Sequence, residues 1–372
     1  APTNWRSKRP HHLQHDATST DDRIPMYRFR FDSPDFDAQL QTLVERPPFD
    51  PDIEQAVSGM LGRIRHEGDA AVCEFARRYD NVSLSPADFA VAPETVDAAS
   101  EQVAPPCRKA IAAACGQVRE CARQRRPEPW SYSPRKGVIL GERYTPMDRV
   151  GIYVPGGTAP LVSTVIHTAV LAAVAGVGEI VMVTPPAADK SIHPALLYAA
   201  REAGVTEILR LGGVYAVGAL AFGTDTVRQV QKIVGPGNAY VTAAKRQVYG
   251  YTAIDMAAGP SEILVIADET ADARFVAADM LSQIEHGSGM EHAVLVTDSD
   301  DLMDAVAAEL ESQAADRQRS ETIRTCLDSG VFLIRCADLT QATEIASRYA
   351  PEHLEIMTRR PGTLAKRVTA AG

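Results

Sequence analysis

The feature that most constrains the fold is a rhythm of strand, turn and helix that begins at Val150. Short β-branched and aliphatic runs alternate with helical segments, and glycine-rich turns separate several of them. This alternation is typical of a parallel sheet with crossover helices. The expected strands are 150–154, 180–184, 208–211 and 232–234; the expected helices are 161–175, 194–203, 215–222 and one that runs to about 249.

The same plan recurs after Gly259. Strands are expected at 262–267, 293–297 and 330–336, and helices at 272–286 and 302–315. A chain of 372 residues exceeds what one hydrophobic core usually serves. The sequence therefore predicts an α/β protein of two Rossmann-like domains, each with an incomplete parallel sheet, at 131–258 and 259–372, with a cleft between them.

The residues before these domains are expected to be helical or disordered. Residues 26–130 form a predicted helical N-terminal region, with an amphipathic stretch at 50–79 that breaks near Gly68 and a second at 104–124. A proline-containing stretch then connects to the first strand. Residues 1–25 are rich in charged residues and proline, lack the apolar core of a signal peptide, and are interpreted as a disordered lead whose histidines are solvated.

Composition narrows the class of partner. The formal net charge of −10 argues against non-specific binding to nucleic acid or to an anionic membrane, so a small-molecule partner is expected. The sequence contains no run of about 18 apolar residues, so no membrane-spanning helix is predicted. The six cysteines show neither C-x-x-C spacing nor the density of a disulfide scaffold, which predicts reduced thiols and a cytoplasmic location.

Two glycine turns each follow a strand and open a helix. They are YVPGG at 153–157 and VGPGN at 234–238. Exposed backbone N–H groups and the positive end of a helix dipole favour an anion such as a dinucleotide phosphate. Neither turn fits G-x-G-x-x-G, and tight turns that need glycine for backbone reasons are an equally good interpretation.

Two further pairs of side chains could carry chemistry. Gln283 and His286 lie three residues apart at the end of the helix expected at 272–286, where an imidazole and an amide oxygen could supply half of a zinc shell; a polar helix end with a solvated histidine is the alternative. Glu352 and His353 follow a proline and could act as carboxylate and general base, or Glu352 could open a helix. The other histidines in the folded region are interpreted as surface or core residues, and His292 has no partner at a telling spacing.

Five sequence blocks together resemble one known family. In order they are GIYVPGGTAPL, KIVGPGNAYV, DMAAGPSEILVIAD, DMLSQIEH and YAPEHLEI. They resemble histidinol dehydrogenase, an NAD- and zinc-dependent enzyme that completes histidine biosynthesis, and the similarity runs from about Phe31 to the last residue. The resemblance implies oxidation of L-histidinol to L-histidine through bound histidinal, two NAD consumed, and a homodimer.

The resemblance also implies roles for individual residues. It implies that Gln283 and His286 are zinc ligands that also approach the substrate, and that Ser261 is a substrate contact. Glu352 and His353 would form the acid–base pair, with His353 also at the substrate. Tyr153 and Asn238 would contact NAD. His353 would take protons from the alcohol and from the hydrated aldehyde, and Glu352 would activate the water that hydrates it.

Two departures from the family pattern leave alternatives open. Tyr215, in GGVYA, stands where the family commonly has a glutamine that contacts NAD. The sequence also ends where the family continues into a segment that supplies an Asp and a His to the zinc, so it is interpreted as a fragment of a longer reading frame. The alternatives are a related dehydrogenase for another small polar alcohol, such as a sulfonated diol, and a truncated protein that binds NAD or dimerises without turnover.

Overall fold

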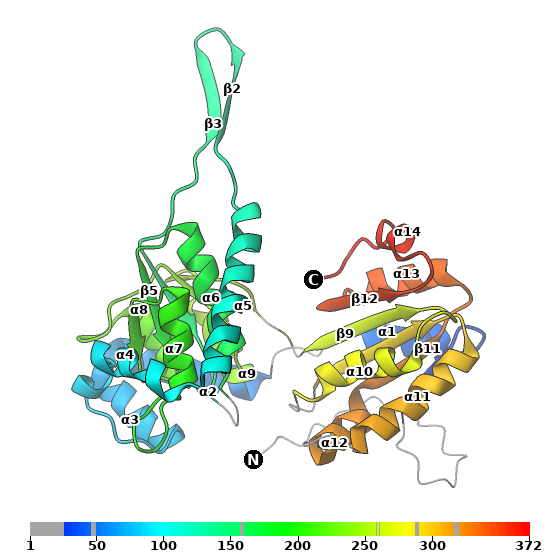
Figure 1. Cartoon of the computed structure of the whole chain (residues 1–372), viewed down its shortest axis with the longest axis horizontal. Helices are drawn as coiled ribbons and strands as arrows, with labels where there is room; N and C mark the ends of the chain where they lie inside the picture. Colours follow the sequence, from blue (N-terminus) through cyan, green and yellow to red (C-terminus); the bar gives the residue numbers. More distant parts are fainter. Residues whose placement is uncertain are drawn as a thin grey trace. The chain divides into compact units, whose positions relative to one another are not determined.

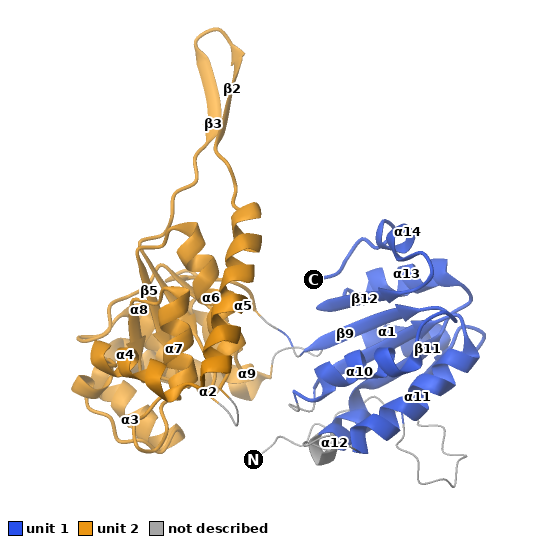
Figure 2. Ribbon diagram, viewed as in Figure 1, with its two compact units in different colours: residues 1–48, 259–372 blue, residues 49–258 orange. Residues whose placement is uncertain are grey.

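A computed structural model describes residues 26–45, 50–156, 160–257, 259, 261–286, 290–315 and 320–372. The chain divides into two compact units (Figures 1 and 2). Unit 1 comprises Ala1–Pro48 and Gly259–Gly372, and unit 2 comprises Phe49–Ala258. Each contains a five-stranded sheet whose described pairings are all parallel. The predicted α/β class is therefore confirmed.

The sheet of unit 2 has the strand order β6-β5-β4-β7-β8. Its strands are β4 (Arg149–Tyr153), β5 (Glu179–Val183), β6 (Glu207–Leu209), β7 (Lys232–Val234) and β8 (Ala253–Ile254). All five residues of β4 are buried, as expected for a parallel strand covered on both faces. The order reverses between β4 and β7, and ligands of doubly wound sheets bind beyond the strand ends at such a reversal.

Helices cover both faces of this sheet. One core cluster joins the sheet to α2 (Pro51–Glu67), α3 (Asp69–Tyr79), α8 (Gly213–Phe222) and α9 (Ala239–Val248). The other joins it to α4 (Pro93–Gln102), α5 (Pro105–Gln124), α6 (Val162–Ala175) and α7 (Pro194–Ala203). The predicted break near Gly68 separates α2 from α3, and this glycine has φ +57°. The early helices are therefore part of unit 2.

Unit 1 has the strand order β1-β11-β10-β9-β12. Its strands are β1 (Tyr27–Arg30), β9 (Glu262–Ala267), β10 (His292–Thr297), β11 (Val331–Arg335) and β12 (His353–Met357). One face packs on α10 (Ala273–Ile284), α11 (Asp300–Ala315) and α12 (Ser320–Gly330). The opposite face packs on α1 (Phe36–Val44), α13 (Leu339–Tyr349) and the short α14 (Pro361–Ala365).

The expected helical region at 26–130 is not a separate domain. Residues 26–45 supply β1 and α1 to unit 1, whereas the helices between residues 51 and 124 belong to unit 2. In β1 only Tyr27 and Phe29 alternate inward, so the strand is too short to show a clear period of two. The expected division after residue 258 coincides with the boundary between the units.

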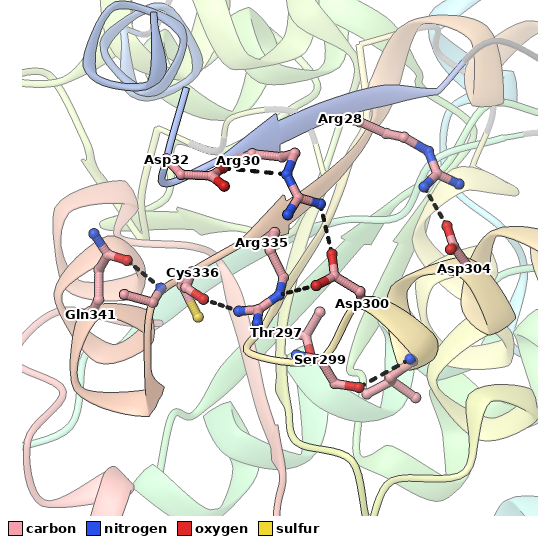
Figure 3. A network of polar contacts seen from close by, with 12 residues as sticks. Arg28, Arg30, Asp32, Thr297, Ser299, Asp300, Asp304, Arg335, Cys336 and Gln341 are labelled. Atoms are coloured by element: carbon pink, nitrogen blue, oxygen red, sulfur yellow. Dashed lines mark hydrogen bonds and ion pairs between the residues drawn. The ribbon is translucent and has the colours of Figure 1, made fainter. Parts of the chain in front are cut away.

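Ion pairs connect β1 to helix α11. Arg30 and Arg335 are paired in register on β1 and β11, and both guanidinium groups reach Asp300 at the start of α11, at 2.6 and 3.1 Å (Figure 3). Arg28 reaches Asp304 one turn further along that helix, at 2.6 Å. These partly exposed pairs add orientation more than free energy. They show that the N-terminal strand is matched to α11 as well as to the sheet.

The expected connection before the first strand of unit 2 contains a β-hairpin. Strands β2 (Trp130–Arg135) and β3 (Val138–Glu142) pair antiparallel, and all their residues are exposed except Val138, which is half-buried. Figure 1 shows the hairpin extending away from the rest of unit 2. Pro134 lies within β2, and a proline in a strand is confined to edges, so it concealed the strand in the sequence. Within the described residues, no helix is long and apolar enough to cross a membrane.

The assignment of β1 to unit 1 predicts the effect of Phe29→Ala. Phe29 is 2% exposed and its ring lies 5.9 Å from that of Phe332. Truncation should lower the free energy of unfolding of unit 1 by about 3–5 kcal/mol and leave the unit 2 transition unchanged in calorimetry. Phe275→Ala, at a side chain 63% exposed, is the matched control and should cost less than about 0.5 kcal/mol. Equal losses for the two variants would contradict the assignment.

Candidate active site

The residues predicted for catalysis and zinc lie at the amino ends of the strands of unit 1. Ser261 directly precedes β9, and His353 opens β12. Helix α10 connects β9 to the parallel neighbour β10, so it runs antiparallel to both strands and its C-terminal end returns to the same edge. Gln283, in the last turn of α10, and His286, just after it, therefore share this edge with Ser261 and His353.

Glu352 and His353 are held where β12 begins. The Oε2 atom of Glu352 accepts a hydrogen bond from the backbone N–H of Glu262 at 3.2 Å and lies 3.8 Å from Nε2 of His353. Both side chains are about half exposed, at 48% and 54%. The alternative in which Glu352 opens a helix is wrong, because a strand follows it. The pair thus places a carboxylate beside an imidazole, open to solution.

The carboxylate pair Glu355 and Asp279 shows which face of β12 carries His353. Alternation along β12 puts His353 and Glu355 on one face, and Glu355 interacts with Asp279 of α10. Burial, followed by the charge of and hydrogen bond to Asp279, raises the pKa of Glu355. Gln283 lies one helical turn beyond Asp279, and the helix runs opposite to β12. Gln283 therefore lies on the same face of α10 as Asp279, the residue that meets β12.

His286 is exposed and held through one ring nitrogen. Its Nδ1 lies 3.1 Å from the backbone oxygen of Gln283, and its side chain is exposed. An N–H at Nδ1 would fix the tautomer that leaves Nε2 as an acceptor for a cation. Helix α10 ends at Ile284, so His286 lies two residues beyond the helix rather than on it.

Gln283 and His286 carry two atoms of the kinds that zinc accepts as ligands. An imidazole nitrogen and an amide oxygen account for two of the four ligands that zinc usually takes. Among the described residues there is no group of three or more His, Cys, Asp or Glu side chains that could hold a metal. The donor atoms of Gln283 and His286 fit zinc in kind, and zinc binding here stays a prediction.

The two predicted cofactor turns meet in unit 2, at the reversal of strand order. Gly235 follows β7 with φ +120°, and a Cβ atom there would overlap the carbonyl oxygen of Tyr153 at the end of β4. Asn238 caps α9, because its Oδ1 accepts from the backbone N–H of Val241 at 3.1 Å, and it is exposed. Its amide nitrogen can still donate to a ligand. Residues 157–159 of the first turn lie outside the described residues.

Tyr153 is in the core rather than on the surface. It is 4% exposed, and its hydroxyl accepts a hydrogen bond from the backbone N–H of Gly213 at 3.1 Å. Burial raises the pKa of Tyr153 to about 12. The side chain thus joins the end of β4 to the start of α8, and its expected contact to NAD stays a prediction.

Tyr215 also points into the core. It is 1% exposed, and its hydroxyl donates a hydrogen bond to the carboxylate of Asp80, just after α3. Burial raises the pKa of Tyr215 above its usual range, and it raises that of Asp80 as well. Asp80 was missed in the sequence because a single aspartate after a helix carries no signal. The tyrosine in GGVYA is therefore engaged by the protein itself.

The remaining histidines divide as the sequence suggested. His66 and His167 are exposed on α2 and α6, and His193 caps α7, its Nδ1 accepting from the backbone N–H of Ala195 at 3.1 Å. His292 does have a partner, since its Nδ1 lies 3.1 Å from the hydroxyl of Tyr349. Spacing could not show this pair because the two residues come from β10 and α13.

Comparisons with known proteins agree with this architecture. The profile of the histidinol dehydrogenase family matches residues 45–372. Histidinol dehydrogenase of Rhizobium meliloti (strain 1021) is 44% identical over 338 residues, which cover 91% of this chain and 77% of the relative. That of Heliobacterium mobile is 46% identical over 323 residues, covering 87% and 75%. The crystal structure of histidinol dehydrogenase from Elizabethkingia anophelis superposes with a TM-score of 0.87 at 33% identity, covering 93% of this chain and 79% of the other.

The fold and these matches define an oxidoreductase of the dehydrogenase class. The chain belongs to the histidinol dehydrogenase family. The resemblance inferred from five sequence blocks is therefore confirmed.

The contact between Tyr215 and Asp80 predicts a stability loss in Tyr215→Phe. Removing the hydroxyl deprives the partly buried carboxylate of Asp80 of this donor, which should cost about 1–3 kcal/mol in urea denaturation at neutral pH. The variant raises the pKa of Asp80 further, so the loss should shrink in acid, where the carboxyl group is protonated. Tyr144→Phe is the control, because Tyr144 donates to Glu142 at 2.7 Å on the exposed surface. A loss independent of pH would argue against this account.

Proposed function

We propose that the chain catalyses the NAD-dependent oxidation of L-histidinol to L-histidine through bound histidinal. The observation that carries the proposal is the position of Glu352 and His353 at the start of β12, tied to β9 by the N–H of Glu262 at 3.2 Å. Ser261 and the pair Gln283 and His286 lie at the same edge of the sheet. One edge thus combines a base, a carboxylate and groups suited to a polar substrate.

His353 is proposed as the general base in both oxidations. In the first, it takes the hydroxyl proton while a hydride leaves the carbinol carbon, giving the aldehyde. In the second, it takes a proton from the hydrated aldehyde while a second hydride leaves, giving the carboxylic acid. Its ring is half exposed, so it is accessible to a substrate hydroxyl and can accept the proton of that hydroxyl.

Glu352 is proposed to activate the water that hydrates the aldehyde. The backbone N–H of Glu262 holds its Oε2, which orients the carboxylate and leaves the other oxygen to accept a hydrogen bond from water. Its Oε2 lies 3.8 Å from Nε2 of His353, which places the proposed water-activating group beside the proposed base.

Zinc and NAD are proposed as the cofactors. Gln283 and His286 would hold the metal, which when bound supplies positive charge that orients the amine and imidazole of L-histidinol. NAD, which accepts the hydrides, is proposed at the glycine turns of unit 2, with Tyr153 and Asn238 as contacts and its phosphates at the N-terminus of α9. A homodimer in the cytoplasm is proposed on the resemblance and the cysteine pattern.

The alternative of another small polar alcohol rested on the change at Tyr215. That side chain is buried and bonded to Asp80, in the unit that does not contain Glu352 and His353. It therefore gives no reason to prefer a different alcohol, and L-histidinol is the substrate that the proposal names.

The proposed base predicts the effect of His353→Gln. With L-histidinol, NAD and added zinc, kcat for NADH formation should fall by about 10²- to 10⁴-fold, because proton removal loses its acceptor. The affinity for NAD should stay unchanged. His66→Gln, at an exposed histidine of α2, should retain full activity. If the unaltered protein binds both cofactors yet oxidises a sulfonated diol and not L-histidinol, the proposed substrate is wrong.

The proposed metal pair predicts the zinc content of His286→Ala. Loss of the imidazole should lower bound zinc several-fold after dialysis, measured by atomic absorption, because imidazole is the stronger of the two ligands. His167→Ala, an exposed histidine of α6, should retain the zinc content of the unaltered protein. Equal zinc in both variants would remove His286 from the shell.

A further inference from the structure

The backbone N–H and carbonyl of Gly235 are each held by a charged side chain, one buried and one partly buried. Its N–H donates to Oδ2 of Asp255 at 2.7 Å, and its carbonyl oxygen accepts from Nζ of Lys245 at 2.8 Å. Lys245 and Asp255 also form an ion pair with each other. The lysine is 2% exposed, although lysine is among the residues least often buried.

The two charged side chains stabilise a turn at Gly235 whose backbone polar groups make their hydrogen bonds to side chains. Gly235 has φ +120°, a region that only glycine enters readily, and its backbone passes directly against Tyr153. Both of its backbone polar groups bond to side-chain atoms, Oδ2 of Asp255 and Nζ of Lys245. The conformation that leads to Asn238 and the N-terminus of α9 therefore depends on the two charged side chains.

We propose that Lys245 and Asp255 are positioning residues for cofactor binding. They fix Gly235 so that Asn238 and the first N–H groups of α9 are presented to the dinucleotide. Neither residue needs to touch the cofactor, because Lys245 is buried behind the turn. The inference rests on the proposed binding of NAD at this turn and extends it to the residues that support the site.

The same helix offers a matched control. Arg246 follows Lys245 and forms an ion pair at 2.9 Å with Glu54 of α2, away from the turn. If Lys245 served stability alone, Lys245→Met and Arg246→Met would behave alike. If it positions the turn, only Lys245→Met changes the affinity for NAD.

The test is calorimetric titration of NAD into the protein and its variants. Lys245→Met should raise the Kd for NAD about tenfold, the size typical of a lost supporting contact, and Arg246→Met should leave it within twofold. Asp255→Asn, at a side chain 27% exposed, should raise the Kd in the same direction and is the second variant if Lys245→Met does not fold. In turnover, KM for NAD should rise while kcat at saturating NAD is retained.

A double-mutant cycle shows whether Lys245 acts through Asn238. Asn238→Ala alone should weaken NAD binding, and adding Lys245→Met should weaken it by less than the product of the single effects. If the unaltered protein binds no NAD, the proposed cofactor site fails and this inference falls with it. If Asn238→Ala weakens binding but neither Lys245→Met nor Asp255→Asn does, the cofactor site stands and the positioning role is wrong.

Discussion

Parallel pairing of β9 with both β10 and β12 is the constraint on which the candidate active site depends. The register sets His353 against Ile263 and His292 against Glu262, so three segments distant in sequence begin at one edge. Because the strands are parallel, the helix after β9 must return to that edge before β10 can start. Ser261, His353 and the end of α10 meet there through chain direction, before any side-chain contact is considered.

The two units use opposite edges of their sheets, and the helix ends found there suit different charges. In unit 2 the glycine turns lie beyond the carboxyl ends of β4 and β7, where α9 begins with the exposed residues Ala239 and Tyr240 and the positive end of its dipole favours phosphate. In unit 1 the candidate zinc ligands lie at the C-terminal end of α10, where carbonyl groups favour a cation. The proposed assignment of NAD to one unit and zinc to the other follows the sign of these helix ends.

Sequence patterns anticipated the elements that have a strong period or a clear punctuation mark. Strands β4 to β7 and β9 to β11, the break at Gly68 and the division after residue 258 follow from apolar runs and glycines. Strand β8, of two residues, and strand β12, which begins at the motif that could also have opened a helix, were not anticipated. Strand β1 is too short to show a period, and Pro134 concealed the hairpin. Local spacing singled out the pairs Gln283 with His286 and Glu352 with His353, but only the resemblance joined them with Ser261 in one site, because their meeting depends on strand register, which no local spacing contains.

Two polar pairs behind the glycine turns could not be predicted from the sequence for a related reason. Asp80 with Tyr215, and Asp255 with Lys245, each join a residue on a helix to one in a connection, and nothing in the sequence matches the partners. Each pair nonetheless sits behind a glycine turn: a Cβ at Gly212 would approach Asp80 to 2.9 Å, and Gly235 is bonded to both members of the other pair. Because glycine has no Cβ, the backbone can approach Asp80 at Gly212 and Tyr153 at Gly235. The polar side chains behind each turn then fix the position of the backbone. A substitution such as Tyr215 in GGVYA is thus accommodated when its polar group finds a partner in the layer behind the turn.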